Sequence, residues 1–248
     1  MVATQNLLLA SLPRKEYLEL LQGLSPVTLT LGEVLYEPGR RMRHVYFPSA
    51  SLVSLLTKVD GHVSLEVGMV GREGMVGTPL VLGVAESPVR ALVQGAGAAL
   101  RMDGARFLRI FHRSPSLQRG VNRYIHVLMG QISQTAACNR FHLVDARLAK
   151  WLLMTRDRVA AGEFRMTHEF LSHMLGVRRE GVTEAASIFQ KQNLIEYSRG
   201  KIRILDHRGL EAAACSCYAA GSGVSAPWRP GRHRPGAADR SAGALFPS

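Results

Sequence analysis

Apolar side chains in the carboxyl-terminal third of the chain recur at helical spacing on both sides of one glycine. The first set fits positions i, i+1, i+4 and i+5 of a helix that begins at the capping residue Thr167, and consists of Phe170, Leu171, Met174 and Leu175. Gly176 follows, where a glycine can take the left-handed conformation that ends a helix. A second helix is predicted over about residues 178–192, with a buried side of Val182, Ala185, Ala186 and Phe189. The pattern therefore predicts two short helices joined by a tight turn.

The other side of the second helix opens with long polar side chains, namely Arg178, Arg179, Glu180, Thr183 and Glu184. In a helix-turn-helix, the amino-terminal turns of the second helix enter the major groove of DNA. Two short alternating runs follow around Arg199-Gly200, which predicts a basic hairpin, or wing, whose Arg199 and Lys201 can reach phosphates. An ordinary pair of helices with a solvated charged face would share the helical pattern, and the wing favours the DNA-binding interpretation.

The first part of the chain has a different period. Residues 6–24 predict a helix entered at Ser11, with a buried side of Tyr17, Leu18, Leu20 and Leu21. From Val27 onward, Gly and Pro residues separate short apolar runs at residues 45–47, 52–57 and 63–70. In the last run the apolar residues alternate with Ser64, Glu66 and Gly68, which is typical of a half-buried strand, and Asp60-Gly61 before it predicts a hairpin turn. Many short strands predict a small β-roll or barrel.

Two longer helices are predicted between the strands and the helix pair. Over residues 116–140, apolar side chains recur every three to four positions and form a narrow seam of Leu117, Val121, Tyr124, Ile125, Leu128 and Ile132. This seam could pack on the chain's own roll, but it is longer than one small domain usually covers. A further amphipathic helix is predicted over residues 142–159, so a hinge should lie near Cys138 to Phe141.

Composition narrows the compartment and the class of partner. The chain has 248 residues, enough for two domains, and a net charge of +12, which favours a polyanionic partner. That charge alone would also suit RNA or an anionic membrane surface. No apolar run approaches the roughly 18 residues of a membrane helix, and the apolar run at residues 7–10 is too short for a secretory signal. We expect a cytoplasmic bacterial protein without a membrane partner.

The three cysteines do not form an even framework that would imply an oxidising compartment. Cys215 and Cys217 could donate two thiolates to a metal, but a closed zinc or iron–sulfur site needs about four ligands. Only Cys138 and scattered histidines such as His207 remain, so the sequence predicts no metal site and no cofactor. After Cys217-Tyr218 the chain becomes rich in Gly, Pro, Ala, Ser and Arg, which predicts a disordered tail over 219–248 and suggests a reading frame that runs past its natural end.

The segment from Met166 to Thr183, with Gln192-Asn193-Leu194-Ile195 after it, resembles the winged helix-turn-helix of the Crp/Fnr superfamily of bacterial transcription regulators. The resemblance covers roughly residues 6–210. In the family pattern an Arg-Glu pair near the start of the recognition helix reads bases, and Arg179-Glu180 match it. The family often has a further arginine one turn later, where this chain has Glu184, so the preferred operator is expected to differ. The resemblance implies an α+β fold with a cyclic-nucleotide-binding-like β-roll, a long dimerisation helix and a winged helix-turn-helix.

The resemblance also implies an effector pocket in the roll. Nucleotide-binding members of the family hold the ribose with a Gly-Glu pair and the cyclic phosphate with an arginine. The corresponding loop, residues 71–79, has Thr78 where the glutamate is expected, and Arg90 is the candidate for the phosphate role, although it could equally be a surface charge. We therefore expect a degenerate pocket at Thr78 and Arg90 that does not bind cyclic AMP in the usual way and whose small-molecule effector is unknown.

Together these patterns predict a transcription regulator that binds a palindromic operator in double-stranded DNA as a homodimer, with no enzymatic activity. The predicted dimer interface is the seam of Leu117, Val121, Tyr124, Ile125, Leu128 and Ile132. RNA polymerase is a possible further partner. Arg179 and Glu180 read bases, Arg178 and Thr183 contact the backbone or neighbouring bases, and Thr167, His168, Arg199 and Lys201 contact phosphate. The predicted domains are residues 1–115, 116–140, 141–212 and 219–248. The alternative is a ligand-sensing signalling module that acts through protein contacts, with weak or vestigial DNA binding.

Overall fold

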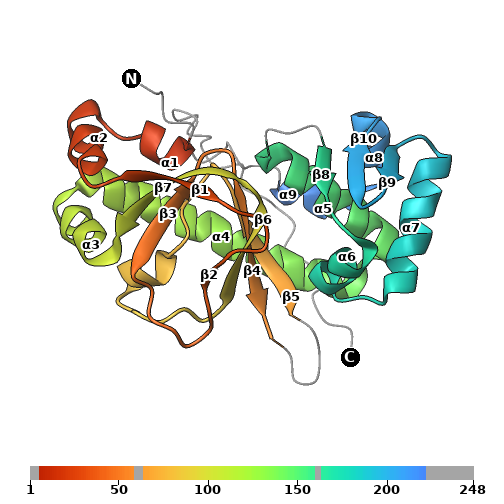
Figure 1. Ribbon diagram of the computed structural model, residues 1–248, viewed down its shortest axis with the longest axis horizontal. Coiled ribbons are helices and arrows are strands. Elements are labelled where there is room, and N and C mark those ends of the chain that lie inside the picture. The colour runs from red at the N-terminus through yellow and green to blue at the C-terminus, as the bar shows by residue number, and fades with distance from the viewer. Residues whose placement is uncertain (1–5, 59–63, 160–162, 222–248) are drawn as a thin grey trace, which may run out of the picture.

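The β-rich and the helix-rich parts of the chain lie at opposite ends of the molecule (Figure 1). The computed structural model describes residues 6–58, 64–159 and 163–221. Strands β1 to β7 form one end and the helix-turn-helix the other, and helix α4 runs from the first toward the second. The predicted α+β class, a β-roll before a winged helix-turn-helix, is confirmed. The predicted turn at Asp60-Gly61 and the tail beyond Gly221 lie outside the described residues.

The roll consists of two antiparallel sheets, with strand orders β1-β7-β3 and β2-β6-β4-β5. The strand bounds are β1 Ser25–Leu29, β2 Val34–Tyr36, β3 His44–Pro48, β4 Leu52–Thr57, β5 Leu65–Val70, β6 Arg90–Gly95 and β7 Gly97–Asp103. A 3-10 helix, η1 (Thr78–Leu82), separates β5 from β6. The apolar runs that the sequence assigns to strands are therefore strands β3, β4 and β5.

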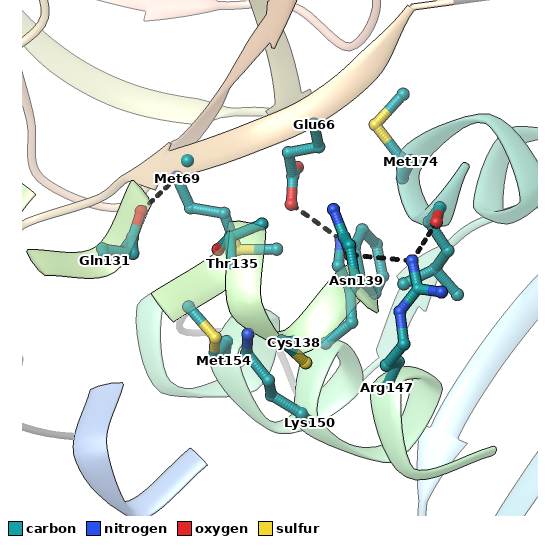
Figure 2. A pocket seen from close by; sticks show the side chains of 13 residues that line it. Glu66, Met69, Gln131, Thr135, Cys138, Asn139, Arg147, Lys150, Met154 and Met174 are labelled. Atoms are coloured by element: carbon teal, nitrogen blue, oxygen red, sulfur yellow. Dashed lines mark hydrogen bonds between the residues drawn. The ribbon is translucent and has the colours of Figure 1, made fainter. Parts of the chain in front are cut away.

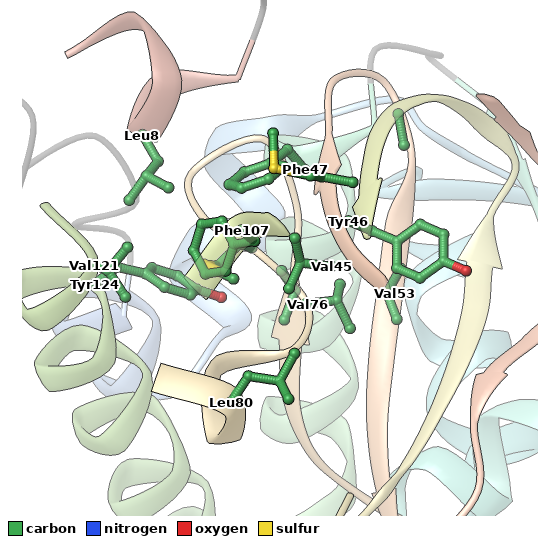
Figure 3. Close-up of a cluster of buried hydrophobic side chains, with 14 of the residues drawn as sticks. Leu8, Val45, Tyr46, Phe47, Val53, Val76, Leu80, Phe107, Val121 and Tyr124 are labelled. Carbon is green, nitrogen blue, oxygen red and sulfur yellow. The ribbon is translucent and has the colours of Figure 1, made fainter. Parts of the chain in front are cut away.

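Aromatic and aliphatic side chains from the sheets and the flanking helices fill the roll. Figure 3 shows Phe47, Phe107 and Tyr124 within this cluster. The rings of Phe47 and Phe107 meet edge to face with their centroids 5.9 Å apart. Tyr124 comes from α4, and Gly74 leaves room for it, because a Cβ at Gly74 would lie 2.0 Å from atoms of the Tyr124 ring. Helix α4 is therefore built into the core of the roll.

The amino-terminal segment forms two helices, where the sequence predicts one. These are α1 (Leu7–Ala10) and α2 (Arg14–Leu21). The helix breaks before Pro13 because proline lacks an N–H and disfavours the helical conformation in the residue that precedes it. Leu20 is fully buried as predicted, but Leu18 is 45% exposed, so the prediction is wrong there. Once the helix begins at Arg14, its inner stripe passes through Leu20 and leaves Leu18 on the outer face.

Three helices follow the roll: α3 (Gly104–Arg113), α4 (Pro115–Phe141) and α5 (Val144–Arg158). Helix α4 has 27 residues and is capped by Ser114, whose hydroxyl accepts from the Leu117 amide. It passes the predicted hinge at Cys138 without a break. The break comes at His142 and Leu143, which are both extended. The hinge therefore lies after the predicted position.

The remaining elements form the helix-turn-helix end around a second core. They are β8 Glu163–Arg165, α6 His168–Leu175, α7 Arg179–Lys191, β9 Ile195–Ser198, β10 Lys201–Ile204, α8 His207–Ala213 and α9 Cys217–Gly221. The wing is a three-stranded sheet of order β8-β10-β9, and the sequence does not predict β8 because three residues show no periodicity. Helix α9 extends into the tail predicted from Ala219. None of the described helices is long and apolar enough to cross a membrane.

Candidate nucleic-acid interface

The turn between α6 and α7 carries the local signals that the sequence predicts. The Thr167 hydroxyl accepts a hydrogen bond from the Phe170 amide at 3.1 Å and caps α6. Gly176 ends the helix with a φ of 61°, in the left-handed region. The buried side of α7 is the predicted one, and each member is at most 3% exposed: Val182, Ala185, Ala186 and Phe189. The turn and this buried side fix α7 against α6, and the opposite face of α7 lies in solvent.

The exposed face of α7 carries the predicted reading residues Arg178, Arg179, Glu180 and Thr183. Arg178 is the N-cap residue, and its side chain makes no capping hydrogen bond. The backbone amides of the first turn are therefore not covered by a capping side chain, which suits an anion at this end of the helix. Arg179 and Glu180 lie in the same turn, so a forked cation and a carboxylate acceptor stand side by side at the leading end of α7.

His168 has a different position from the one expected. Its Nδ1 lies 2.9 Å from the Thr183 hydroxyl, and its ring stacks on Tyr197 of β9 with centroids 4.3 Å apart. Because the Thr183 hydroxyl donates its proton to the Arg179 carbonyl, Nδ1 of His168 must be the donor of the shared bond. Burial, and then the Arg179 charge, lower the pKa of His168. Through these contacts His168 braces α6 against the recognition helix and the wing, a role that the sequence does not predict.

The wing places its cations at the tip of a tight hairpin. Strands β9 and β10 pair in register across a turn in which Arg199 has a φ of 50° and Gly200 a φ of 76°. Two successive residues with positive φ match the twist of the flanking strands. Arg199 and Lys201 are both exposed. The hairpin therefore holds two basic side chains beyond the helix pair, as the sequence predicts.

The roll encloses an apolar cavity of about 130 Å³ against α4. Its lining includes Tyr36, Met42, Thr78 and Val89 of the roll with Leu128 and Ile132 of α4. Arg90 is not part of the lining and pairs with Glu37 at 2.9 Å, with both side chains more than a third exposed. The expected phosphate-binding role of Arg90 is therefore not supported, and Thr78 is the part of the predicted pocket that does face a cavity.

Polar side chains between strand β5 and helix α5 form a buried contact that the sequence does not predict. Glu66 lies on β5, on the face that the alternating pattern gives to solvent, yet it is 7% exposed and accepts from Trp151 Nε1 of α5 at 2.9 Å. Figure 2 shows Glu66 pointing from the strand into a small pocket bordered by Cys138, Asn139 and Arg147. The outer face of β5 is buried because α4 and the helix-turn-helix end cover it.

A second buried contact joins the loop of the roll to the end of α5. Arg158 Nε lies 2.8 Å from Glu73 Oε1, and both side chains are almost fully buried. The Gly71 amide donates to the same carboxylate oxygen, and Arg158 also donates to the Met154 carbonyl. An ion pair of this kind is costly to break one partner at a time, because the remaining charge would be buried alone. The two ends of the molecule are thus joined by specific polar contacts.

The seam of α4 divides into two faces. Leu117, Val121, Tyr124 and Leu128 are at most 7% exposed within their own chain. These four side chains have no surface to offer a second subunit, and their assignment to a dimer interface is corrected. They pack on the roll, which was the simpler interpretation. Ile132 is 37% exposed and Met129 beside it 63% exposed, so a different stripe of α4 faces outward.

The three cysteines converge with one histidine at the end of α4. Cys138, His142, Cys215 and Cys217 each present a ligand atom, and these atoms lie within 4.8 Å of one another. The expectation of too few ligands for a metal is therefore wrong, because His142 supplies a fourth. His207 is not part of this group and instead binds Arg156. The sequence does contain one signal for this group, the i, i+4 spacing of Cys138 and His142. This spacing brings both residues to one side of a helix end.

The fold and these surfaces define a two-domain protein with a β-roll, a long connecting helix and a winged helix-turn-helix. Residues 146–213 match the family of Crp-like helix-turn-helix domains, so this part of the chain is a Crp-like helix-turn-helix domain. A sequence comparison with curated proteins found no match.

Solved structures share the fold over most of the chain. A putative transcriptional regulator of the Crp/Fnr family from Eubacterium rectale has a TM-score of 0.64 at 18% identity, covering 82% of this chain and 94% of its own. FixK2 from Bradyrhizobium japonicum has a TM-score of 0.66 at 13% identity, covering 78% and 98%. The c-di-GMP-responsive global regulator CLP from Xanthomonas campestris has a TM-score of 0.64 at 15% identity, covering 78% and 100%. The chain therefore has the fold of Crp/Fnr transcription regulators.

Proposed function

We propose that the protein is a sequence-specific DNA-binding transcription regulator of the Crp/Fnr type. The observation that carries the proposal is the front of α7, where Arg179 and Glu180 stand exposed beside a basic wing in a Crp-like helix-turn-helix domain. The net charge of +12 suits a polyanionic partner. A regulator of this kind acts where bacterial DNA is, in the cytoplasm, and its output passes to RNA polymerase.

Two residues read the bases of the DNA, and the others position the protein on its backbone. Arg179 can fork onto the O6 and N7 of guanine, and Glu180 can accept from the N4 of cytosine. Arg178, Thr167, Arg199 and Lys201 contact the backbone, where cations and helix ends set the register without reading sequence. The hydroxyl of Thr183 is already bound to Arg179 and His168, so its role is to hold the recognition helix.

Dimerisation uses the outward stripe of α4. The exposed positions 122, 126, 129, 133, 136 and 140 recur at helical spacing, with Met129 and the neighbouring Ile132 and Ile125 supplying apolar surface. Two helices pairing along this stripe would relate two reading heads by a twofold axis, with half-sites about 34 Å apart and a palindromic operator. We expect Met129→Glu to convert the dimer to a monomer in sedimentation, while Arg113→Glu on α3 should leave the dimer intact. An unchanged dimer in the Met129 variant would rule out this interface.

The roll is the effector domain, with a pocket that does not suit cyclic AMP. The cavity of about 130 Å³ is close in size to the roughly 150 Å³ apolar cavity that holds a benzene-sized guest. Its lining is mostly apolar, and Arg90 is engaged with Glu37 outside it. A small apolar molecule fits this space, and a charged nucleotide does not. Calorimetry with cyclic AMP should show no binding, and micromolar binding that Arg90→Ala abolishes would contradict this assignment.

The domain boundaries follow from these roles. We place the effector domain in residues 1–115, the dimerisation helix in 116–140 and the DNA-binding domain in 141–212. The residues 219–248 lie beyond all three.

Selection of bound sequences from a random DNA pool tests the proposed function. The wild-type protein should enrich a palindrome whose half-sites are one helical turn apart. Arg179→Ala should cost about 1–3 kcal/mol on the selected site and relax one base position, whereas Lys201→Ala should weaken specific and random DNA alike and reduce the salt dependence. No enrichment at moderate ionic strength would overturn the proposal and favour a signalling module that acts through protein contacts.

A further inference from the structure

Four soft ligands from two distant parts of the chain meet at the junction between the long helix and the DNA-binding domain. Cys138 lies in the last turn of α4, and His142 is the C-cap residue of that helix. Cys215 lies between α8 and α9, and Cys217 is the first residue of α9. All three cysteines are free thiols at most 8% exposed, and His142 is half-buried. The three cysteines form a small cluster of their own, separate from both main cores.

The separations of these ligand atoms fit one tetrahedral ion. A tetrahedral zinc site with Zn–S bonds of about 2.3 Å and Zn–N bonds of about 2.0 Å has S···S edges of about 3.8 Å and S···N edges of about 3.5 Å. Cys138 Sγ and Cys215 Sγ are 3.6 Å apart, and Cys217 Sγ and His142 Nδ1 are 3.4 Å apart. No pair in the group exceeds 4.8 Å, so the whole set can close on one ion with small side-chain movements.

We propose that Cys138, His142, Cys215 and Cys217 bind a single zinc ion in a closed Cys3His site that ties the end of α4 to the end of the DNA-binding domain. Three thiolates and one imidazole are a ligand set that zinc uses in structural sites. An iron–sulfur cluster is a poor fit, because its cysteines bind different irons and must stand further apart than this group does. The site has no open position, so its role is structural.

The surroundings supply the support that such a site needs. Gln134 Nε2 donates to Cys217 Sγ at 2.9 Å, a bond that would orient that thiolate and stabilise its charge. Arg147 borders the same pocket as Cys138. A zinc ion with three thiolates carries one net negative charge, which the nearby guanidinium would offset. The Cys215 amide also donates to the Ala146 carbonyl of α5. This hydrogen bond holds the segment that carries Cys215 and Cys217 against α5.

The position of the site gives it a consequence for the whole molecule. His142 is the first of the two extended residues that separate α4 from α5. A metal held jointly by α4, this break and the segment after α8 would lock the hinge in one geometry. Loss of the metal, or oxidation of its thiolates, would release the DNA-binding domain from that geometry.

Metal content of the full-length protein tests the proposal directly. The reduced protein, loaded with Zn²⁺ and dialysed, should hold about one zinc per chain. Cys217→Ser and His142→Ala should lower this content several-fold, and Gln134→Ala should weaken zinc affinity about tenfold. The matched controls are Ser216→Ala, which lies between the two cysteines, and His207→Ala, a histidine outside the cluster. Both should keep the zinc content of the wild type.

Two measurements on the wild-type protein keep the test decisive if the variants fail to fold. Co²⁺ in place of zinc should give the visible bands of a tetrahedral site together with thiolate charge-transfer absorption. Bound Zn²⁺ should also protect all three cysteines from alkylation until a chelator removes it. A wild-type protein that takes up neither ion, or controls that lose zinc as the ligand variants do, would overturn the proposal. So would a Cys138–Cys215 disulfide in freshly purified, metal-loaded protein. None of these results bears on DNA binding, which is measured separately.

Discussion

Glu66 offers a direct test of how the roll holds the DNA-binding domain. Its carboxyl group lies between β5 and α5, with Oε1 accepting from Trp151 Nε1 at 2.9 Å and Oε2 lying 2.5 Å from the Ser54 hydroxyl. The Ser54 hydroxyl has a second close neighbour, Gln94 Oε1, which can only accept. A hydroxyl has one proton and cannot donate to both oxygens. The contacts are satisfied when Glu66 is protonated and donates to Ser54, which then donates to Gln94.

The pKa of Glu66 agrees with that pattern. Burial raises the pKa from 4.5 to about 7, and the hydrogen bonds from Ser54 and Trp151 only partly offset the effect. Because the folded protein holds this proton more tightly than the unfolded chain, the contribution of Glu66 to stability is complete below about pH 4.5 and is lost as the pH rises through about 7. The cost of ionisation reaches about 2 kcal/mol at pH 6 and about 3 kcal/mol at pH 8.5.

Glu66→Gln should remove this pH dependence. The amide reproduces the hydrogen bonds of the protonated acid, because its oxygen can accept from Trp151 and its nitrogen can donate to Ser54. The free energy of unfolding of the variant, measured in urea, should exceed that of the wild type, and the difference should grow by about 1 kcal/mol between pH 6 and pH 8.5. Glu19→Gln, which changes an exposed carboxylate on α2, should follow the wild type. A Glu66→Gln curve parallel to the wild type would refute the argument that this carboxyl titrates near neutral pH.

Three further changes test packing and capping through urea unfolding. Thr167→Ala should lower the free energy of unfolding by about 1 kcal/mol, because the Phe170 amide loses its cap; an unchanged value would show that solvent replaces the cap. Gly74→Ala should cost about 3 kcal/mol, because the added Cβ would meet the buried Tyr124 ring at 2.0 Å; a neutral result would mean that α4 can move away from the roll. Gly176→Ala should cost about 1–2 kcal/mol for its left-handed backbone alone, and a loss below that range would place the helix end elsewhere.

The helix-turn-helix is predictable because its signals are local. The Thr167 cap, the Gly176 turn and the buried stripe of α7 each depend on residues a few positions apart, and the structure confirms all of them. The Arg199-Gly200 hairpin is likewise set by the backbone preferences of its own residues. The roll is predictable as a class for the same reason, since its short strands and its glycines repeat along the chain.

The failures of the sequence analysis at Glu66, along α4 and at the cysteine cluster concern contacts between distant segments. The alternation of apolar and polar residues along β5 predicts that Glu66 is exposed to solvent, but Glu66 is buried. The alternation describes a single strand and carries no information on the helices that cover that strand. The apolar seam of α4 has the same sequence pattern whether it packs on the roll or on a second subunit. In the structure Leu128 packs in the core of the roll, while Ile132 remains accessible. The pairing of Cys138 with Cys215 depends on α8 returning to the end of α4, which no periodicity encodes.

These tertiary contacts form a continuous series of packed elements between the cavity and the helix-turn-helix end. Helix α4 forms one wall of the cavity through Leu128 and Ile132, and in the same turn its Gln131 accepts from the Met69 amide of β5. Strand β5 in turn binds α5 through Glu66 and Trp151. A ligand that moved α4 within the roll would therefore strain both the β5 contact and the Cys3His cluster at the helix end. Packed interfaces tend to switch between discrete arrangements and do not deform smoothly. Binding of a ligand in the cavity would therefore change the geometry of the hinge at His142. The metal site and Glu66 both lie near that hinge, because Glu66 and Cys138 border the same small pocket. Zinc removal and ionisation of Glu66 should therefore each loosen the DNA-binding domain.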